Sequence, residues 1–196
     1  MDLSCFFEPV HSAVRATYPL RPDCLARTLE RHSAAFPDWT EADVLLVGCT
    51  EERGGLGTEG CGEAADAIRA ELDALGNHWP QLRIADLGNL VPKADLDDVY
   101  FTLQYLCEQF LLKDKLVLVL GGTHDLSLGM FQALGKLERR VDYVAIDAQP
   151  DLFDSELGLN HSSHHHRMLS QSPSILGRFS LLGQQNYLLS TEELLV

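Results

Sequence analysis

Two short motifs in the second half of the chain carry side chains that could bind a metal ion. The run LVLVLGGTHD ends in His124 and Asp125, and the run VDYVAIDAQPD ends with Asp147 and Asp151 around its last turn. Both runs begin with leucines and β-branched residues, which are typical of buried parallel strands. Because open α/β sheets bind ligands at the carboxyl ends of their strands, we expect these four side chains to face one crevice. Carboxylates together with an imidazole suit a divalent cation such as manganese.

A histidine cluster in GLNHSSHHHRML is a second candidate metal site. If this segment is helical, His161, His164 and His165 lie on one face and could bind zinc or nickel, with His166 beside them. The alternative is an exposed, histidine-rich surface segment that binds nothing. We favour the exposed segment, because exposed imidazoles gain little support from surrounding hydrogen bonds.

A glycine-rich turn raises the possibility of nucleotide binding. Gly55, Gly57 and Gly60 satisfy the pattern GxGxxG, and Asp86 could then bind a ribose. Five residues, Cys49 to Arg53, separate the preceding strand from this turn, and the glutamates nearby would repel a pyrophosphate. A flexible loop that leads into a helix is the favoured interpretation, and we expect no nucleotide cofactor.

The surrounding pattern predicts an α/β fold that would position these residues. Short apolar strands are expected at 43–48, 81–86, 115–120, 141–147 and 179–182, and helices at 24–36, 63–75, 96–112 and 126–137. Strands that alternate with helices indicate a doubly wound parallel sheet in a three-layer α/β/α arrangement, and we expect one domain over 1–196. In the longest helix, one face should be core, with apolar residues at three- to four-residue spacing: Val99, Leu103, Leu106 and Phe110.

Composition narrows the classes of partner. The net charge of −14 argues against nucleic acid and anionic membranes as partners, because binding to them requires an excess of lysine and arginine. The chain has no apolar run of the roughly 18 residues needed to cross a bilayer, and its first residues lack a basic segment, so we expect a cytoplasmic protein. The five cysteines form no CxxC pair and are expected to be reduced thiols.

The order of the motifs is similar to that of the ureohydrolase family, which contains arginases, agmatinases and formimidoylglutamases. GGTHD followed by DAQPD resembles the family's GGxH and DAHxD motifs, and GCGEAADAIRAEL and IADLGN resemble its first helix and second strand. The resemblance covers roughly residues 42–182, and a divergent formimidoylglutamase-like member is the best match. It implies an arginase-like fold and metal-dependent hydrolysis of a C–N bond in a linear amidine or guanidine, such as formiminoglutamate, agmatine or arginine.

The same resemblance assigns roles to individual residues. Family members hold two manganese ions that activate a water molecule. By resemblance, His124 and Asp151 would bind the first ion and Asp147 would bridge both. His161 is the nearest equivalent of a histidine that moves protons or binds substrate. Related enzymes are trimers or hexamers, so we expect a homo-oligomer.

The sequence departs from the family pattern at two places. Gln149 replaces the histidine of DAHxD that binds the second ion, and an amide oxygen is a weaker ligand. The family also needs a later SxDxD motif, whereas this chain has no aspartate after Asp154. We therefore expect an impaired site with little activity, or a catalytically inactive relative that serves in binding or assembly.

The predicted strands are too few for the complete family sheet, whose strand order is 2-1-3-8-7-4-5-6. We expect either that the chain lacks the family's C-terminal strands, or that its third and fourth strands pair directly in a flavodoxin-like order 2-1-3-4-5. The first alternative is favoured because the last residues, TEELLV, resemble the start of a helix.

Overall fold

The computed structural model describes residues 2–11, 20–153 and 158–191. The chain divides into two compact units. Unit 1 consists of Met1–Glu52, Thr58–Val99 and Gln109–Thr123, and unit 2 of Arg53–Gly57, Tyr100–Glu108 and His124–Val196. A single domain over 1–196 stays a prediction.

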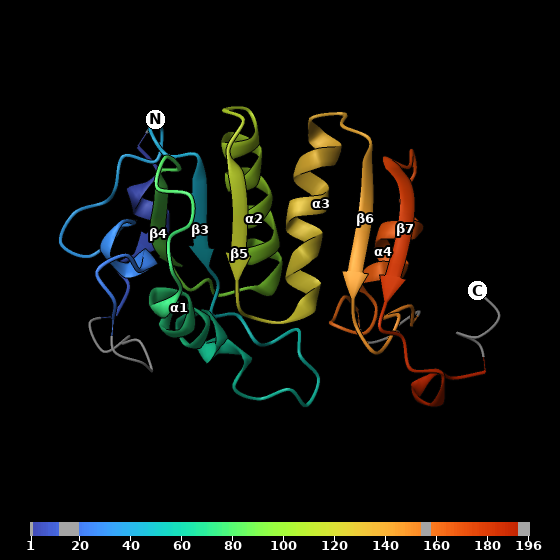
Figure 1. Cartoon of the computed structure of the whole chain (residues 1–196). Helices are drawn as coiled ribbons and strands as arrows, with labels where there is room; N and C mark the ends of the chain where they lie inside the picture. The colour runs from blue at the N-terminus through green and yellow to red at the C-terminus, as the bar shows by residue number, and fades with distance from the viewer. Residues whose placement is uncertain (1, 12–19, 154–157, 192–196) are drawn as a thin grey trace. The chain divides into compact units, whose positions relative to one another are not determined.

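Unit 1 is built on a mostly parallel sheet (Figure 1). Its central strand β3 (Val44–Gly48) lies between β4 (Ile84–Leu90) and β5 (Leu116–Leu120), and all three run parallel. All five residues of β3 are buried, as its VLLVG sequence predicts for a strand covered on both faces. Two short strands, β1 (Phe7–Glu8, antiparallel) and β2 (Glu30–Arg31, parallel), also pair with β4.

The helix predicted at 24–36 is wrong. The segment contains a single 3-10 turn, η2 (Leu25–Arg27), followed by β2. The reason is tertiary: the extended backbone lets Arg31 reach two buried carboxylates, Asp73 at 2.7 Å and Asp86 at 3.1 Å. These long-range ion pairs, together with pairing to β4, outweigh a weak local helical pattern.

The other predicted helices form close to their expected bounds. They are α1 (Ala64–Ala74), α2 (Leu96–Leu111) and α3 (Ser127–Lys136). The predicted apolar stripe of α2 is confirmed, since Val99, Leu103, Leu106 and Phe110 are all buried. The structure also contains three short 3-10 turns, η1 (Ser4–Phe6), η3 (Cys61–Glu63) and η5 (Asn186–Leu188).

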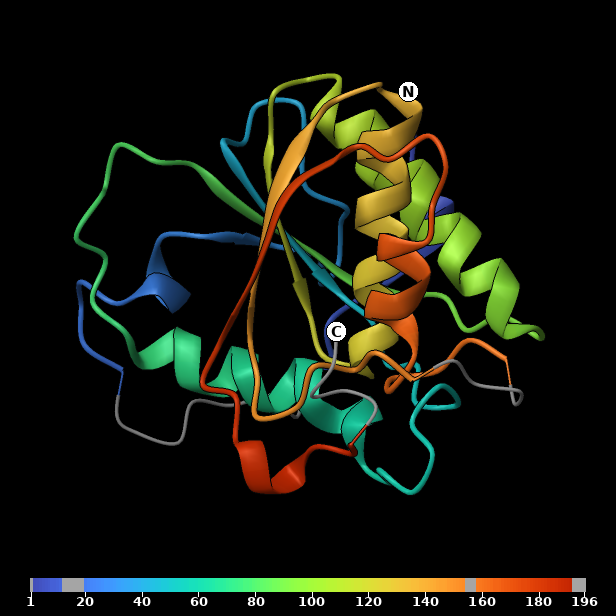
Figure 2. The same ribbon diagram turned by 90° about the vertical axis from the view of Figure 1, so that its right-hand side faces the viewer.

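Unit 2 contains a parallel pair of strands, β6 (Val141–Ile146) and β7 (Leu176–Leu182). Figure 2 shows α3 and the short helix α4 (His164–Leu169) on the same face of this pair. Leu128, Phe131 and Met168 form the core between the helices and the strands. The 3-10 turn η4 (His124–Leu126) leads directly into α3, so it carries the first candidate ligand into this unit.

The strand order within each unit agrees with part of the predicted sheet. In unit 1, β3 lies between β4 and β5, and in unit 2, β6 pairs with β7. The partial orders 2-1-3 and 4-5 occur in both the arginase-like and the flavodoxin-like arrangement, so the choice between these two stays a prediction. The expected helix at TEELLV lies almost entirely outside the described residues. Among the helices that are described, none is long and apolar enough to cross a membrane.

Candidate metal site

The first three predicted metal ligands meet in unit 2. His124 lies in η4, Asp147 follows the last residue of β6, and Asp151 lies in the next turn. The Nδ1 atom of His124 is 3.2 Å from an oxygen of Asp147 and 3.1 Å from an oxygen of Asp151. One ligand atom from each of the three side chains lies within 4.8 Å of the others, which makes them a group able to hold a metal ion.

The backbone after β6 turns sharply, which brings both carboxylates to one point. Asp151 follows Pro150 and has a φ of 51°, in the left-handed region that side chains other than glycine rarely adopt. Its carboxylate is almost buried, with 7% of the side chain exposed. Two carboxylates four residues apart could face one ion only through such a turn, so the conformation is the one that the motif requires.

The charge balance of this group suits a cation. The hydrogen bond to Asp151, supported by the charges of Asp151 and Asp147, raises the pKa of His124 above its ordinary value although burial acts against this shift. When His124 is protonated, its charge compensates the two carboxylates. A divalent cation supplies the same compensation, and the oxygen-rich donor set fits manganese.

Asp125, the fourth residue expected to face the same crevice, does not point toward the other three. It is fully buried, and the hydroxyl of Tyr100 donates to its carboxylate. It belongs to neither of the groups found among the described residues that could hold a metal ion. The adjacent positions 124 and 125 thus diverge, because a 3-10 turn points successive side chains in different directions.

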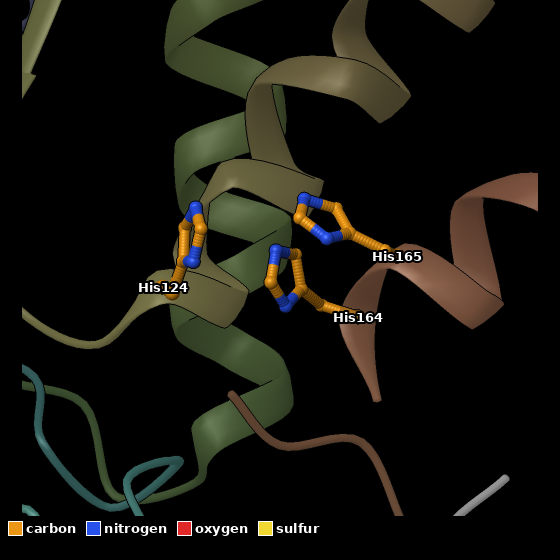
Figure 3. A group of neighbouring side chains, drawn as sticks. All are labelled: His124, His164 and His165. Atoms are coloured by element: carbon orange, nitrogen blue, oxygen red, sulfur yellow. The ribbon is translucent and has the colours of Figure 1, made fainter. Parts of the chain in front are cut away.

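A second group unites His124 with two histidines of the predicted cluster. Figure 3 shows the rings of His164 and His165, both from α4, pointing toward the ring of His124. One ring nitrogen from each of the three lies within 4.8 Å of the others. Since His164 and His165 are 0% exposed, an exposed surface segment is the wrong interpretation for these two residues.

The hydrogen bonds of the two buried histidines define their tautomers. Nδ1 of His164 is 2.7 Å from the carbonyl oxygen of His161, and Nδ1 of His165 is 2.8 Å from that of Pro150. Because a carbonyl only accepts, each Nδ1 carries the hydrogen and each Nε2 is left with a lone pair. Burial lowers the pKa of both rings, for His164 to about 2, so both are neutral.

His161 lies outside this histidine group. The helix α4 begins at His164, so His161 lies before it, and the alternative of one helical face that carries all three histidines does not hold. Its Nδ1 lies 3.3 Å from both the carbonyl oxygen of Gly54 and the amide nitrogen of Leu56, and its Nε2 lies 3.0 Å from the hydroxyl of Ser162. Its backbone N–H also donates to the carbonyl oxygen of Gly54 at 2.9 Å, which ties His161 to the 53–57 loop of the same unit. Its predicted catalytic role stays a prediction.

Gln149 lies at the surface of the turn between the two aspartates. Its backbone N–H donates to a carboxylate oxygen of Asp147 at 3.0 Å, and the residue is exposed. The backbone of Gln149 therefore helps to orient Asp147. A metal-binding role for its side chain stays a prediction.

The glycine turn does not have the features of a dinucleotide site. A carboxylate oxygen of Glu52 accepts hydrogen bonds from the backbone of Gly60 and Gly62, both at 3.1 Å, and thus takes amides that a phosphate would need. Asp86, the proposed ribose ligand, is fully buried against Arg69. Both observations, made within unit 1, argue against nucleotide binding there.

Comparison with known proteins agrees with this geometry. Residues 42–189 match the profile of the arginase family. The chain belongs to the arginase family. Among its relatives, a formimidoylglutamase of Citrobacter koseri is 29% identical over 136 residues, covering 65% of this chain and 43% of the relative. A formimidoylglutamase of Macrococcus caseolyticus is 34% identical over 122 residues, covering 59% of this chain and 39% of the relative. The chain thus matches less than half the length of either relative.

Solved structures support the arginase-like fold of this family member. Formimidoylglutamase from Bacillus subtilis superposes with a TM-score of 0.74 at 17% identity, covering 94% of this chain and 59% of that one. A formiminoglutamase from Trypanosoma cruzi, described with Mn²⁺, superposes with a TM-score of 0.69 at 22% identity, covering 78% and 56%. At these identities the likeness shows the fold alone.

Tyr143 is a further polar residue of this site that sequence reasoning missed. Its hydroxyl lies 3.0 Å from Nε2 of His165 and 3.5 Å from the hydroxyl of Ser127. The available signal was alternation in VDYVAI, which places Tyr143 on the same face of β6 as the buried Ala145. That face is covered by α3 and α4, so a tyrosine there needs a polar partner.

Proposed function

We propose that this chain binds a divalent cation through His124, Asp147 and Asp151 and, when loaded, hydrolyses a C–N bond of a linear amidine or guanidine. The observation that carries the proposal is the convergence of these three side chains on one point in unit 2. Membership of the arginase family supports the reaction class. Relatives named formimidoylglutamase and agmatinase suggest formiminoglutamate or agmatine as substrates.

The charged and neutral groups of the proposed site would have different roles. When bound, the metal supplies Lewis acidity that lowers the pKa of a water molecule. Asp147 and Asp151 provide the negative charge that holds the cation, and His124 must give up its proton to act as a ligand. The backbone N–H of Gln149 keeps Asp147 oriented, and the left-handed turn keeps Asp151 in reach. Manganese is the proposed ion because oxygen donors outnumber nitrogen here.

Metal binding can be tested without knowing the substrate. Manganese titration of the protein by calorimetry should show a site in the wild type that Asp147→Asn loses. Asp142→Asn is the matched control, since Asp142 lies on the strand that leads to Asp147 but is exposed and belongs to neither metal group. Equal manganese binding by the wild type and Asp147→Asn would contradict the proposal.

Activity is the second part of the test. Release of ammonia or formamide from formiminoglutamate, and of urea from agmatine or arginine, should require manganese and disappear in Asp147→Asn. Metal binding without hydrolysis would instead favour a catalytically inactive relative. Gln149 and the lack of any aspartate after Asp154 are the observations that favour this second candidate.

The oligomeric state and the cellular location of the protein are also proposals. We expect a homo-oligomer in the cytoplasm. Light scattering coupled to size exclusion would give the mass of the particle, and a monomer at micromolar concentration would contradict the expected assembly.

A further inference from the structure

The proposed function does not explain why two neutral imidazoles are buried next to His124. His164 and His165 are 0% exposed, and their ring centroids are 3.8 Å apart. The centroids of His124 and His164 are 4.4 Å apart. Apolar side chains would fill the same space without the cost of burying polar atoms, so packing alone does not account for histidines here.

The Nε2 atom of His164 is the strongest sign of a missing ligand. It is buried and has no hydrogen-bond partner among the described residues. Leaving a buried acceptor unsatisfied is energetically unfavourable. Its lone pair exists because Nδ1 carries the hydrogen toward the carbonyl of His161. Metal-binding histidines characteristically donate the other ring N–H to a carbonyl in this way.

His165 has the same arrangement. Its Nδ1 donates to the carbonyl of Pro150, which leaves Nε2 as an acceptor that takes the hydroxyl of Tyr143. This hydroxyl has a second partner in Ser127, at 3.5 Å. It can therefore turn toward Ser127 and free the lone pair of His165 for a cation.

We propose that His124, His164 and His165 form a zinc site made of three imidazoles. The proposal goes beyond the hydrolytic function and shares with it only His124. Ligand nitrogens of a tetrahedral zinc ion lie about 3.3 Å apart at the usual zinc–nitrogen bond length. The three nitrogens here lie within 4.8 Å of one another, so small side-chain rotations would close the site (Figure 3).

The donor set separates this position from the oxygen-rich one. Imidazole suits zinc, whereas manganese prefers carboxylate and water oxygens. His124 has 34% of its side chain exposed, unlike its two buried partners, so a cation and a fourth ligand from solvent can approach on its side. We therefore expect the chain to bind zinc more tightly than manganese.

Competition with a chromophoric chelator measures this preference. His164→Gln and His165→Gln should each weaken zinc binding about tenfold or more and leave manganese binding nearly unchanged. His166→Gln is the matched control, because it makes the same change on the same helix at a histidine outside the group. Zinc affinity equal to the wild type in both folded variants would overturn the proposal.

Copper substitution of the wild-type protein tests the ligand set without any variant. The nitrogen couplings in the electron paramagnetic resonance spectrum count the coordinated imidazoles, and we expect more than one. A single imidazole would overturn the histidine site and leave the proposed function intact, because His124 is the only histidine of the other group. No specific binding of zinc, manganese or copper would reject both.

Discussion

At the residue scale, the environment of each side chain in unit 2 decides its chemistry more than its type does. His124 contacts two carboxylates and has a raised pKa, whereas His164 is fully buried beside His124 and His165 and has a lowered one. The two residues are of the same type and adjacent in space. Carboxylates stabilise the charged imidazole of the first, and desolvation disfavours the charged form of the second.

Gln149 offers a direct test of whether the family's second position can be restored. Gln149→His should raise manganese affinity by about tenfold, because imidazole binds manganese better than an amide oxygen does. Calorimetric titration of the variant beside the wild type measures the change. Gln81→His serves as the control, since Gln81 is also exposed but belongs to unit 1. Unchanged manganese binding in both variants would mean that position 149 no longer contributes to a site.

The lowered pKa of His164 predicts acid sensitivity of the metal-free protein. The unfolded chain binds a proton at this residue near pH 6.5, whereas the folded chain does so only near pH 2. The stabilising contribution is thus complete above pH 6.5 and falls by about 1.4 kcal/mol per pH unit as the solution is acidified. His165 acts in the same direction. His124 acts in the opposite direction, but only above pH 6.5, where its contribution is lost as pH rises.

Urea denaturation of metal-free protein at pH 5, 6 and 7 measures this dependence. We expect the free energy of unfolding to decrease toward pH 5 in the wild type, and to decrease less in His164→Gln. The same slope in both proteins would show that His164 is not a buried neutral group.

At the element scale, one arginine joins a helix to the sheet of unit 1. Arg69 of α1 is fully buried. It binds both oxygens of Asp86 on β4, with distances of 2.9 Å from Nε to Oδ2 and 2.9 Å from Nη2 to Oδ1. It also donates to Asn89 and to the carbonyl oxygen of Gly88. A bidentate pair of this kind specifies orientation as well as contact, so α1 has a defined register on β4.

Replacing Arg69 should therefore destabilise unit 1 strongly. Arg69→Met leaves Asp86 buried with Arg31 as its remaining cationic partner among the described side chains, and we expect a loss of about 3–5 kcal/mol in the free energy of unfolding. Arg83→Met is the control, because Arg83 forms an exposed pair with Glu41, and its loss should cost less than about 1 kcal/mol. Thermal and urea unfolding compare the two, and equal losses would contradict the buried network.

At the scale of the whole molecule, both candidate metal groups belong to unit 2. None of their residues comes from unit 1. Zinc or manganese should therefore stabilise unit 2 by an amount that increases with the affinity and concentration of the metal. Either metal should stabilise unit 1 only if both units unfold in one cooperative step.

Hydrogen exchange with mass spectrometry separates these outcomes. On adding metal, we expect slower exchange in η4, α4 and the turn after β6, and unchanged exchange in β3 and β4. The Asp147→Asn and His164→Gln variants should lose the effect of manganese and zinc, respectively. Equal protection in both units would contradict independent opening, and no protection in η4 would contradict metal binding at His124.

The sequence by itself determined the strands β3, β5 and β6, the buried stripe of α2 and the order of GGTHD and DAQPD. These features are local, because residue spacing within one strand or helix directly sets which side chains share a face. From them follow the fold class, the family and the three candidate ligands His124, Asp147 and Asp151.

The tertiary structure alone decided three further features. It made 30–31 a strand through ion pairs to distant carboxylates, it paired β6 with β7, and it turned His164 and His165 inward toward His124. Each depends on contacts between segments far apart in the chain. Local periodicity carries no information about such partners, since a polar residue can face water or a buried partner with the same spacing.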